Sequence, residues 1–471
     1  MRIKITILYA LFALLSCGSG KSGDGPEVKP PSGELGKVET YRYSPSVIPS
    51  TRFTVSVNGE NQLVHETPEP DFCLFGADGR VKVEVRSYVK KIESAVVRPL
   101  YRNVEYNVGD DRLTLYMEPG DRFVVEINGD EASPLFLFAN PVEEKPSDRS
   151  GYKYFEAGGV YDAGQITLDS NQKVYIEGGA VVKGYLSAVG RENVGIEGCG
   201  ILDDGDNDSR TVTFYKCKGV TMKNVLVRNR NNWTTFIVES TGVRAEGYKV
   251  VATASDKADG SGNENDGFDV MGCNDVIVKS CFAYCHDDAF CVKSQKWGYS
   301  GETYDVEFDD CVAWNRNCGN SFELGYETGK DVHDVVFRNV CAVHSAGSAK
   351  EFRRGAIGLQ NGAGGRVHDI LYENMWLEDP KEYGIYITII NSGYNIGNDV
   401  TWTPGYIEGI TFRNISLGVM PPKGNFLAGY DSAEHSIKGV VFENLSIAGK
   451  KVTTASEAGF KTFKNTDAIF K

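Results

Sequence analysis

Three aspartates stand close together in the middle of the sequence, each beside an apolar run. Asp266 lies in the segment NENDGFDVMG, and Asp287 and Asp288 follow in YCHDDAFCVKS. Like charges that share a site raise one another's pKa, which stability alone would not select. A shared site also drives pKa values apart, so that one carboxyl is protonated while others are ionised near neutral pH. The cluster therefore suits acid–base catalysis, although a lone Asp-Asp pair would more simply cap a turn.

Hydrolysis of a glycosidic bond is a reaction that needs such a cluster. One carboxyl protonates the leaving oxygen while another activates water, and an inverting enzyme keeps the two groups roughly 6.5 to 9.5 Å apart. Coils of stacked strands lie about 4.8 Å apart, so one or two coil spacings would provide this gap. We predict Asp266, Asp287 and Asp288 as catalytic residues on adjoining coils.

The coils are predicted from a repeat in the second part of the chain. A motif of an apolar residue, any residue, a small polar residue and another apolar residue recurs, mostly at intervals of 29 to 40 residues. Its copies are MKNV at 222, VKSC at 278, FDDC at 308, FRNV at 337, YENM at 372, FRNI at 412 and FENL at 442. A second column of short strands alternates with it, and helical periodicity is absent. This pattern predicts an all-β fold whose main part is a right-handed parallel β-helix.

Alternation along the second column predicts which side chains face away from the core. Asp269, Cys291 and Glu323 would face outward on consecutive coils, together with Lys293. These residues would extend the acidic patch around the three aspartates. The polar residues of the first motif are expected to form a ladder at a turn by bonding the neighbouring coil; they are Asn224, Asn339, Asn374, Asn414 and Asn444.

The first part of the chain has a different pattern. Short alternating runs such as RFTVSVNG and RFVVEING, bounded by turn residues, predict an antiparallel β-sandwich over residues 24–140. Residues 141–165 are polar and contain proline, which is typical of a linker, and the β-helix would occupy 166–471. The sandwich is expected either to bind glycan or to cover the open end of the β-helix.

The beginning of the chain resembles an export signal. Arg2 and Lys4 precede an apolar stretch that is too short to span a bilayer. The sequence LLSC is similar to a bacterial lipoprotein box, which would make Cys17 the lipidated residue, with residues 1–23 as signal and tether. We therefore expect an exported protein, periplasmic or anchored by lipid to the outer membrane of a Gram-negative bacterium. Ordinary secretion with cleavage nearby is the alternative.

Composition limits the possible partners. The formal charge of -14 argues against nucleic acid, whose phosphates would be repelled. The ten cysteines after Cys17 lie mostly in apolar runs, which favours core packing over disulfides. Six scattered histidines and the absence of a CxxC pair speak against zinc, and the run DKADGSGNEND lacks the glycine of a calcium loop. No metal or cofactor is expected, and we expect a monomer with a polysaccharide or oligosaccharide as its partner.

The motifs NDGFDV, DDAFCVK and GNSFELG, in this order, resemble the polygalacturonases of glycoside hydrolase family 28 and their relatives of family 49, the dextranases and isopullulanases. The similarity covers about residues 165 to 450. It implies a parallel β-helix and hydrolysis with inversion. It also implies Asp287 as the general acid, with Asp266 and Asp288 positioning and deprotonating the water. An amino-terminal sandwich is closer in style to the dextranase group.

Two departures from the polygalacturonase pattern bear on the substrate. The family's Gly-His-Gly motif is replaced by Gly319, Asn320 and Ser321. The family's Arg-Ile-Lys motif, whose cations grip the galacturonate carboxylate, falls near GAIGLQ, with Ile357 and Leu359 at the cationic places. A uronate subsite without fixed cations would desolvate the sugar's charge at a high free-energy cost. The sequence therefore favours a neutral sugar, although loop cations could restore pectin binding; they are Lys350, Arg353 and Arg354.

Several further residues are candidates for substrate binding. Aromatic rings stack against sugar rings, and Trp233, Trp297 and Tyr326 are placed near the acidic strand, although each could equally be core or loop structure. The polar candidates are Asp269, Lys293, Asn320 and Glu323.

The sequence thus predicts an exported, inverting hydrolase of a polysaccharide or oligosaccharide, with a neutral glucan favoured over pectin. A non-catalytic carbohydrate-binding or adhesion protein is the alternative from another class. A polysaccharide lyase is disfavoured because it needs a basic catalyst with calcium or arginine.

Overall fold

The computed structural model describes residues 34–205, 210–229, 232–254, 265–345, 355–391, 402–430 and 433–471. Their regular structure is almost entirely β-strand, with one short 3-10 helix, η1 (Leu100–Arg102). Across these ranges there is no helix with the length and apolar character needed to cross a membrane. The expected all-β class is confirmed.

The amino-terminal strands form two antiparallel-rich sheets that face each other across an apolar core, as predicted. The six-stranded sheet contains β1 (Val38–Glu39), β4 (Val64–His65), β5 (Asp71–Ala77), β7 (Ala95–Arg98), β10 (Arg122–Ile127) and β11 (Leu135–Pro141). The five-stranded sheet contains β2 (Phe53–Val57), β3 (Glu60–Gln62), β6 (Val81–Ser87), β8 (Tyr106–Gly109) and β9 (Arg112–Met117).

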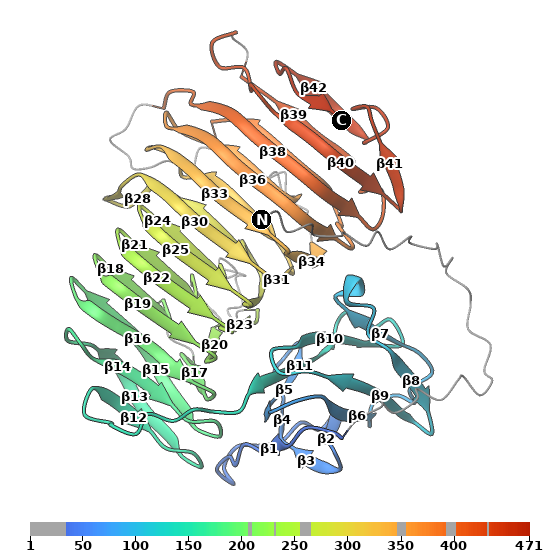
Figure 1. Cartoon of the computed structure of the whole chain (residues 1–471), viewed down its shortest axis with the longest axis vertical. Coiled ribbons are helices and arrows are strands. Elements are labelled where there is room, and N and C mark those ends of the chain that lie inside the picture. Colours follow the sequence, from blue (N-terminus) through green and yellow to red (C-terminus); the bar gives the residue numbers. More distant parts are fainter. Residues whose placement is uncertain are drawn as a thin grey trace, which may run out of the picture.

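The rest of the chain winds into a parallel β-helix with three columns of stacked strands, here called columns A, B and C (Figure 1). Column A contains β14 (Lys173–Ile176), β16 (Glu192–Gly198), β19 (Lys218–Lys223), β22 (Thr241–Glu246), β25 (Asn274–Lys279), β30 (Thr303–Asp309) and β33 (Val332–Arg338). Column B contains β17 (Ile201–Asp203), β20 (Leu226–Asn229), β23 (Lys249–Ala252), β26 (Phe282–Cys285), β31 (Val312–Asn315) and β34 (Cys341–Ser345).

Column C contains β18 (Val212–Tyr215), β21 (Thr235–Val238), β24 (Phe268–Met271), β27 (Phe290–Lys293), β32 (Phe322–Tyr326), β35 (Gly355–Asn361), β37 (Tyr383–Ile389), β39 (Asn425–Ala428) and β42 (Phe460–Lys464). Long strands span columns A and B in the last coils: β36 (Arg366–Leu377), β38 (Tyr406–Leu417) and β40 (Val441–Ile447). A hairpin of β28 (Gln295–Lys296) and β29 (Tyr299–Ser300) follows β27, and β41 (Lys450–Val452) and β43 (Ile469–Phe470) end the chain.

The first coils begin earlier than expected. The predicted linker 141–165 contains β12 (Tyr152–Phe155) and much of β13 (Val160–Thr167). Both strands pair in parallel with strands of the next coil, β14 and β15 (Val181–Val189). An end coil is covered by a neighbouring coil on one side only, so many of its positions are exposed and polar. This polar sequence is why the stretch was predicted to be a linker.

The predicted asparagine ladder is present at the turn between columns A and B. The side-chain amide of Asn374 donates to Asn339, that of Asn414 to Asn374, and that of Asn444 to Asn414, at 2.9 to 3.0 Å. Each of these residues has φ between 53° and 59°, a left-handed conformation that asparagine tolerates. Asn224 shares this conformation at the same turn of an earlier coil. The ladder links the last coils along their edge.

The sandwich packs against the side of the β-helix and not over its open end, so the end-cover expectation is wrong (Figure 1). One apolar cluster joins Phe136 and Phe138 of β11 to Phe282, Tyr284 and other column B residues. The ring of Phe136 lies 5.0 Å from that of Phe282 and 5.3 Å from that of Tyr284. Burial of these aromatic rings fixes the sandwich beside the middle coils.

Nine of the ten cysteines within the described ranges are free thiols that lie buried. They lie in the core as predicted; only Cys318 is partly exposed.

Replacing Phe136 by alanine should destabilise the protein by about 3 to 5 kcal/mol, because a wholly buried ring would leave a cavity between the sandwich and column B. Denaturant unfolding measures this difference. Tyr88→Ala is the control, since Tyr88 is 67% exposed in the same sandwich and should change stability little. Equal effects of the two substitutions would contradict this account of the interface.

Candidate active site

The three predicted catalytic aspartates lie in turns that lead into column C. Asp266 precedes β24, and Asp287 and Asp288 precede β27 on the next coil. Backbone hydrogen bonds continue through these turns, since the amide of Gly267 donates to the carbonyl of Asp288 at 2.8 Å. One carboxylate oxygen from each aspartate lies within 4.8 Å of the others. The fold therefore brings the three side chains together.

The cluster is tighter than the sequence suggested. We expected a gap of roughly 6.5 to 9.5 Å between two carboxyl groups, which is the spacing of inverting enzymes. One oxygen of each carboxylate instead lies within 4.8 Å of the others, which is no more than about one coil spacing. Asp266 and Asp288 are buried, whereas Asp287 is half-buried and the most accessible of the three.

Lys293 lies at the centre of the cluster. Its Nζ atom donates to Asp269 at 2.7 Å and to Asp266 at 3.0 Å, and it lies 3.8 Å from Asp288. The Lys293 side chain is 2% exposed. A buried cation of this kind offsets the repulsion among carboxylates that could not otherwise share the site. Lys293 and Asp269 are buried and paired with each other, and their predicted contact with substrate stays a prediction.

Burial and charge perturb the pKa values in this cluster. Burial raises the pKa of Asp266 well above its usual value, Lys293 opposes this shift, and the neighbouring aspartates add to it. Burial likewise raises the pKa of Asp269, against the effect of Lys293. Burial alone would lower the pKa of Lys293, but Asp266 and Asp269 raise it well above its usual value. The lysine therefore stays charged, and the raised pKa of Asp266 brings that carboxyl nearer to the pH at which a base is efficient.

Two asparagines orient the catalytic turns. Asn320, which takes the place of the family's histidine, donates to Oδ1 of Asp288 from its backbone amide at 2.7 Å and its side chain at 3.2 Å. Asn265 accepts from the backbone amide of His286 at 2.7 Å and donates to the carbonyl of Thr253 at 2.8 Å. Asn265 was not predicted, although its place directly before Asp266 was a possible signal.

An aromatic group borders the carboxylates on the side of the earlier coils. The indole of Trp233 lies 4.2 Å from Nζ of Lys293 and 4.8 Å from the ring of Trp297. Trp233 is 5% exposed, so it supports the site, whereas Trp297 is 52% exposed on the hairpin of β28 and β29. Lys296 and Arg210 lie 4.4 and 5.1 Å from the Trp297 ring, and Lys296 also pairs with Glu327. Of the two tryptophans, Trp297 is thus the one that offers a sugar an accessible face.

Glu323 and Tyr326 lie on β32, one coil beyond the aspartates. Glu323 is wholly buried, and Gln360 donates to its Oε1 at 3.3 Å. A Cβ atom on Gly358 would lie only 1.6 Å from Oε2 of Glu323, so the glycine makes room for this carboxylate. Tyr326 is half-buried at the end of the strand. Both residues extend the site along column C without joining the group held by Lys293.

The structure corrects the placement of the missing cations. Ile357 and Leu359 point into the core of the β-helix, so they do not occupy outward cationic places. The outward positions of β35 that continue the column beyond Glu323 and Gly325 are Gly358 and Gln360. Neither Gly358 nor Gln360 is a cation. The outward positions of β35 therefore lack the family's cations, as expected, although the residues that replace them are not Ile357 and Leu359. Cys17, Lys350, Arg353 and Arg354 lie outside the described residues.

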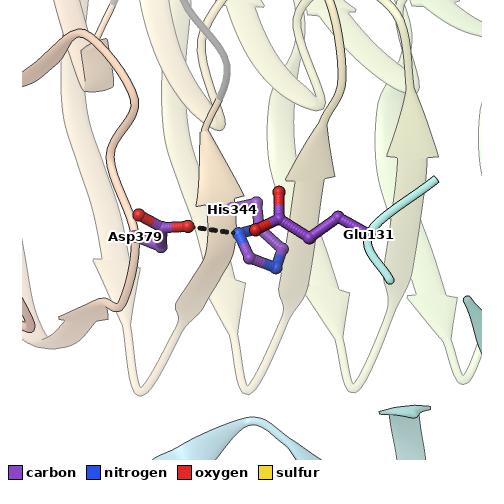
Figure 2. Close-up of side chains that lie close together, drawn as sticks. All are labelled: Glu131, His344 and Asp379. Carbon is purple, nitrogen blue, oxygen red and sulfur yellow. Dashed lines mark hydrogen bonds and ion pairs between the residues drawn. The ribbon is translucent and has the colours of Figure 1, made fainter. Parts of the chain in front are cut away.

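Among the described residues, two groups of side chains have the spacing of metal ligands. The first is the aspartate group itself. The second is formed by Glu131, His344 and Asp379, between the sandwich and column B (Figure 2). His344 is hydrogen-bonded to Asp379 at 2.8 Å, and Lys381 pairs with Glu131 at 3.0 Å. These contacts explain the second group as a network of ion pairs. The absence of a metal stays a prediction.

The sequence pattern of glycosyl hydrolases family 28 matches residues 156–466, which include every column C strand of the site. Probable endopolygalacturonase D of Emericella nidulans is 26% identical over 244 residues, covering 48% of this chain and 43% of that protein. The corresponding protein of Neosartorya fischeri is 25% identical over 188 residues, covering 40% and 36%. The chain thus spans less than half the length of these relatives.

Among solved structures, Dex49A from Penicillium minioluteum is similar in fold. Its TM-score is 0.66 at 14% identity, with 92% of this chain and 96% of that chain covered. The shared fold therefore extends beyond the residues matched by the family pattern and takes in the sandwich.

Replacing Lys293 by methionine should destabilise the protein by about 3 kcal/mol or more near neutral pH, because Asp266 and Asp269 would be left buried without their cation. Both carboxyls already have raised pKa values, and loss of the lysine would raise them further. Their charged forms oppose folding, so the defect should grow as the pH rises and shrink as acid protonates them.

Unfolding curves at several pH values test this prediction. Lys216→Met is the matched control, since Lys216 is 56% exposed and its pair with Glu239 lies at the surface. A defect in Lys293→Met that does not depend on pH would contradict the proposed charge balance.

Proposed function

The chain belongs to glycosyl hydrolases family 28, and we propose that it is an exported hydrolase that cleaves a neutral polysaccharide or oligosaccharide with inversion. The observation that carries this proposal is the group of three aspartates with oxygens within 4.8 Å, arranged around one buried lysine. The family supplies the reaction class, hydrolysis of O-glycosidic bonds.

The exposure of the three aspartates suggests their roles. Asp287 is the most accessible, so it is placed to donate a proton to the glycosidic oxygen. Asp266 and Asp288 are each held by a donor, Lys293 and Asn320 respectively, and are oriented before substrate binds. They would accept a proton from the attacking water. The sugar–oxygen bond breaks as water adds to the anomeric carbon, and Asp287 is left ionised.

The stereochemical part of the proposal rests on the family resemblance. Carboxyl groups of retaining enzymes lie about 5 to 5.5 Å apart, and the oxygen distances here are nearer to that value than to the inverting range. A water held by Asp266 and Asp288 together, with Asp287 as the acid, explains why three carboxylates occupy a site where a retaining enzyme needs two.

Charge at the site favours a neutral sugar. Lys293 is paired with Asp266 and Asp269, and Lys296 is paired with Glu327. The outward positions of β35 carry Gly358 and Gln360. Within the described part of the chain, a uronate carboxylate would therefore meet an acidic cluster in which Lys293 and Lys296 already have carboxylate partners.

A pectic substrate is the second candidate. Its support is the printed name of the curated relatives, endopolygalacturonase, and the position of Arg210 beside the exposed Trp297. Export and lipid attachment at Cys17 are part of the proposal and rest on the sequence alone.

A substrate panel tests the function directly. We expect release of reducing sugar from a neutral glucan or galactan to exceed release from polygalacturonate, and proton NMR of the first product to show the inverted anomer. Activity on polygalacturonate alone would replace the neutral-sugar proposal by the pectic one. Retention of configuration would refute the water-activating pair.

Asp287→Asn should lower kcat by about 100- to 10,000-fold, because an amide has no acidic proton to give the leaving oxygen. Binding of the same glycan, measured by calorimetry, should change only a few-fold. Asp305→Asn is the control, because Asp305 is exposed within the column A strand β30 and asparagine tolerates its φ of 54°. A protein that binds glycan but shows no hydrolysis in either form would be the adhesion-type alternative.

A further inference from the structure

One side chain of the sandwich reaches the two segments that carry the catalytic aspartates. Glu69 lies in the loop between β4 and β5, and its Oε2 atom accepts three hydrogen bonds from the β-helix. The donors are the ring of His286 at 2.8 Å, the hydroxyl of Tyr284 at 3.1 Å and the backbone amide of Ala254 at 3.2 Å. A single carboxylate thus bonds two successive coils where column B ends.

The residues that Glu69 contacts are connected to the catalytic aspartates through adjacent residues and hydrogen bonds. His286 directly precedes Asp287, and its backbone amide donates to Asn265, which directly precedes Asp266. Asn265 in turn donates to the carbonyl of Thr253, the neighbour of Ala254. Glu69, Asn265 and the two coil ends therefore form one hydrogen-bonded unit beneath Asp266 and Asp287.

Glu69 is itself held in a fixed place. The guanidinium of Arg52 donates to the carbonyl of Glu69 at 3.1 Å and pairs with Asp71, and the hydroxyl of Thr67 accepts from the amide of Glu69 at 3.3 Å. Burial alone would raise the pKa of Glu69, but the bond and charge of His286 lower it, so the carboxylate stays ionised. The side chain is 17% exposed. An ionised, partly buried acceptor makes stronger hydrogen bonds than a neutral one.

We propose that Glu69 is a positioning residue through which the sandwich sets the geometry of Asp266 and Asp287. This inference rests on the proposed function. It gives the sandwich a role at the active site that the sequence did not indicate, while glycan binding by the sandwich stays a prediction.

The structure offers a matched control two coils farther along column B. Glu126 of β10 accepts from the ring of His344. The same ring bonds Asp379, as Figure 2 shows. This pair has the same chemistry, a sandwich carboxylate and a buried histidine at the end of a column B strand. Its strand, β34, carries none of the three aspartates.

The kinetic experiment compares Glu69→Gln and Glu69→Ala with Glu126→Gln on the substrate that the panel identifies. We expect Glu69→Ala to lower kcat by about 10- to 100-fold with KM within about 2-fold, since misplaced catalytic groups slow the reaction without removing binding contacts. Glu69→Gln should recover part of kcat because its carbonyl can still accept. Glu126→Gln should keep kcat within about 2-fold.

Hydrogen–deuterium exchange gives a readout that needs no substrate. Peptides covering 249–254 and 282–289 should exchange faster in Glu69→Ala than in the wild type, while 341–345 is unchanged. Glu126→Gln should show the reverse pattern. Thermal unfolding of the three variants establishes that each is folded.

The outcomes separate the two proposals. Faster exchange at 249–254 and 282–289 supports the positioning role even if the wild-type chain hydrolyses no glycan tested, in which case the proposed function alone fails. Unchanged exchange in Glu69→Ala, or an equal loss of kcat in Glu126→Gln, overturns the positioning role while leaving the hydrolase in place.

Discussion

The structure depends on the balance of charge around Lys293. Four aspartates converge on one face of column C, and the ammonium group of this residue lies within hydrogen-bonding distance of two of them and 3.8 Å from a third. Without the cation the buried carboxylates would repel one another and the turns before β24 and β27 could not approach. With the cation in place, the site holds more carboxyl groups than cations and most of these groups are buried. Such an environment gives neighbouring carboxyl groups different pKa values, so that one can donate a proton while another accepts one.

The sequence predicted the parts of this site that follow from periodicity. Two interleaved strand columns placed Asp269, Cys291 and Glu323 on consecutive coils, and the observed register pairs these three residues. The asparagine ladder also followed, because a left-handed turn at a fixed point of each coil selects a residue that tolerates it. Features that recur in every coil can be predicted from the sequence, since each coil has the same kind of neighbours.

Other parts could not be predicted because they depend on contacts without a period. Glu69 lies far from His286 in the chain, and no local pattern distinguishes it from a surface glutamate. The family's cationic positions were assigned to Ile357 and Leu359, one position away from the outward-facing residues of β35. A shift of one position in a strand moves a residue from the outer face to the core face. The distance between the aspartates was overestimated because we allowed for up to two coil spacings, whereas the oxygens lie within about one.

The side-on packing of the sandwich has a consequence for biosynthesis. The aromatic face of β11 is covered by column B residues from Cys199 to Val343, all of which are synthesised after it. Domains generally fold in the order in which they leave the ribosome or the translocation channel, the amino-terminal one first. The sandwich must therefore carry a bare apolar face until the middle coils arrive, and during that interval it is a natural client for a chaperone.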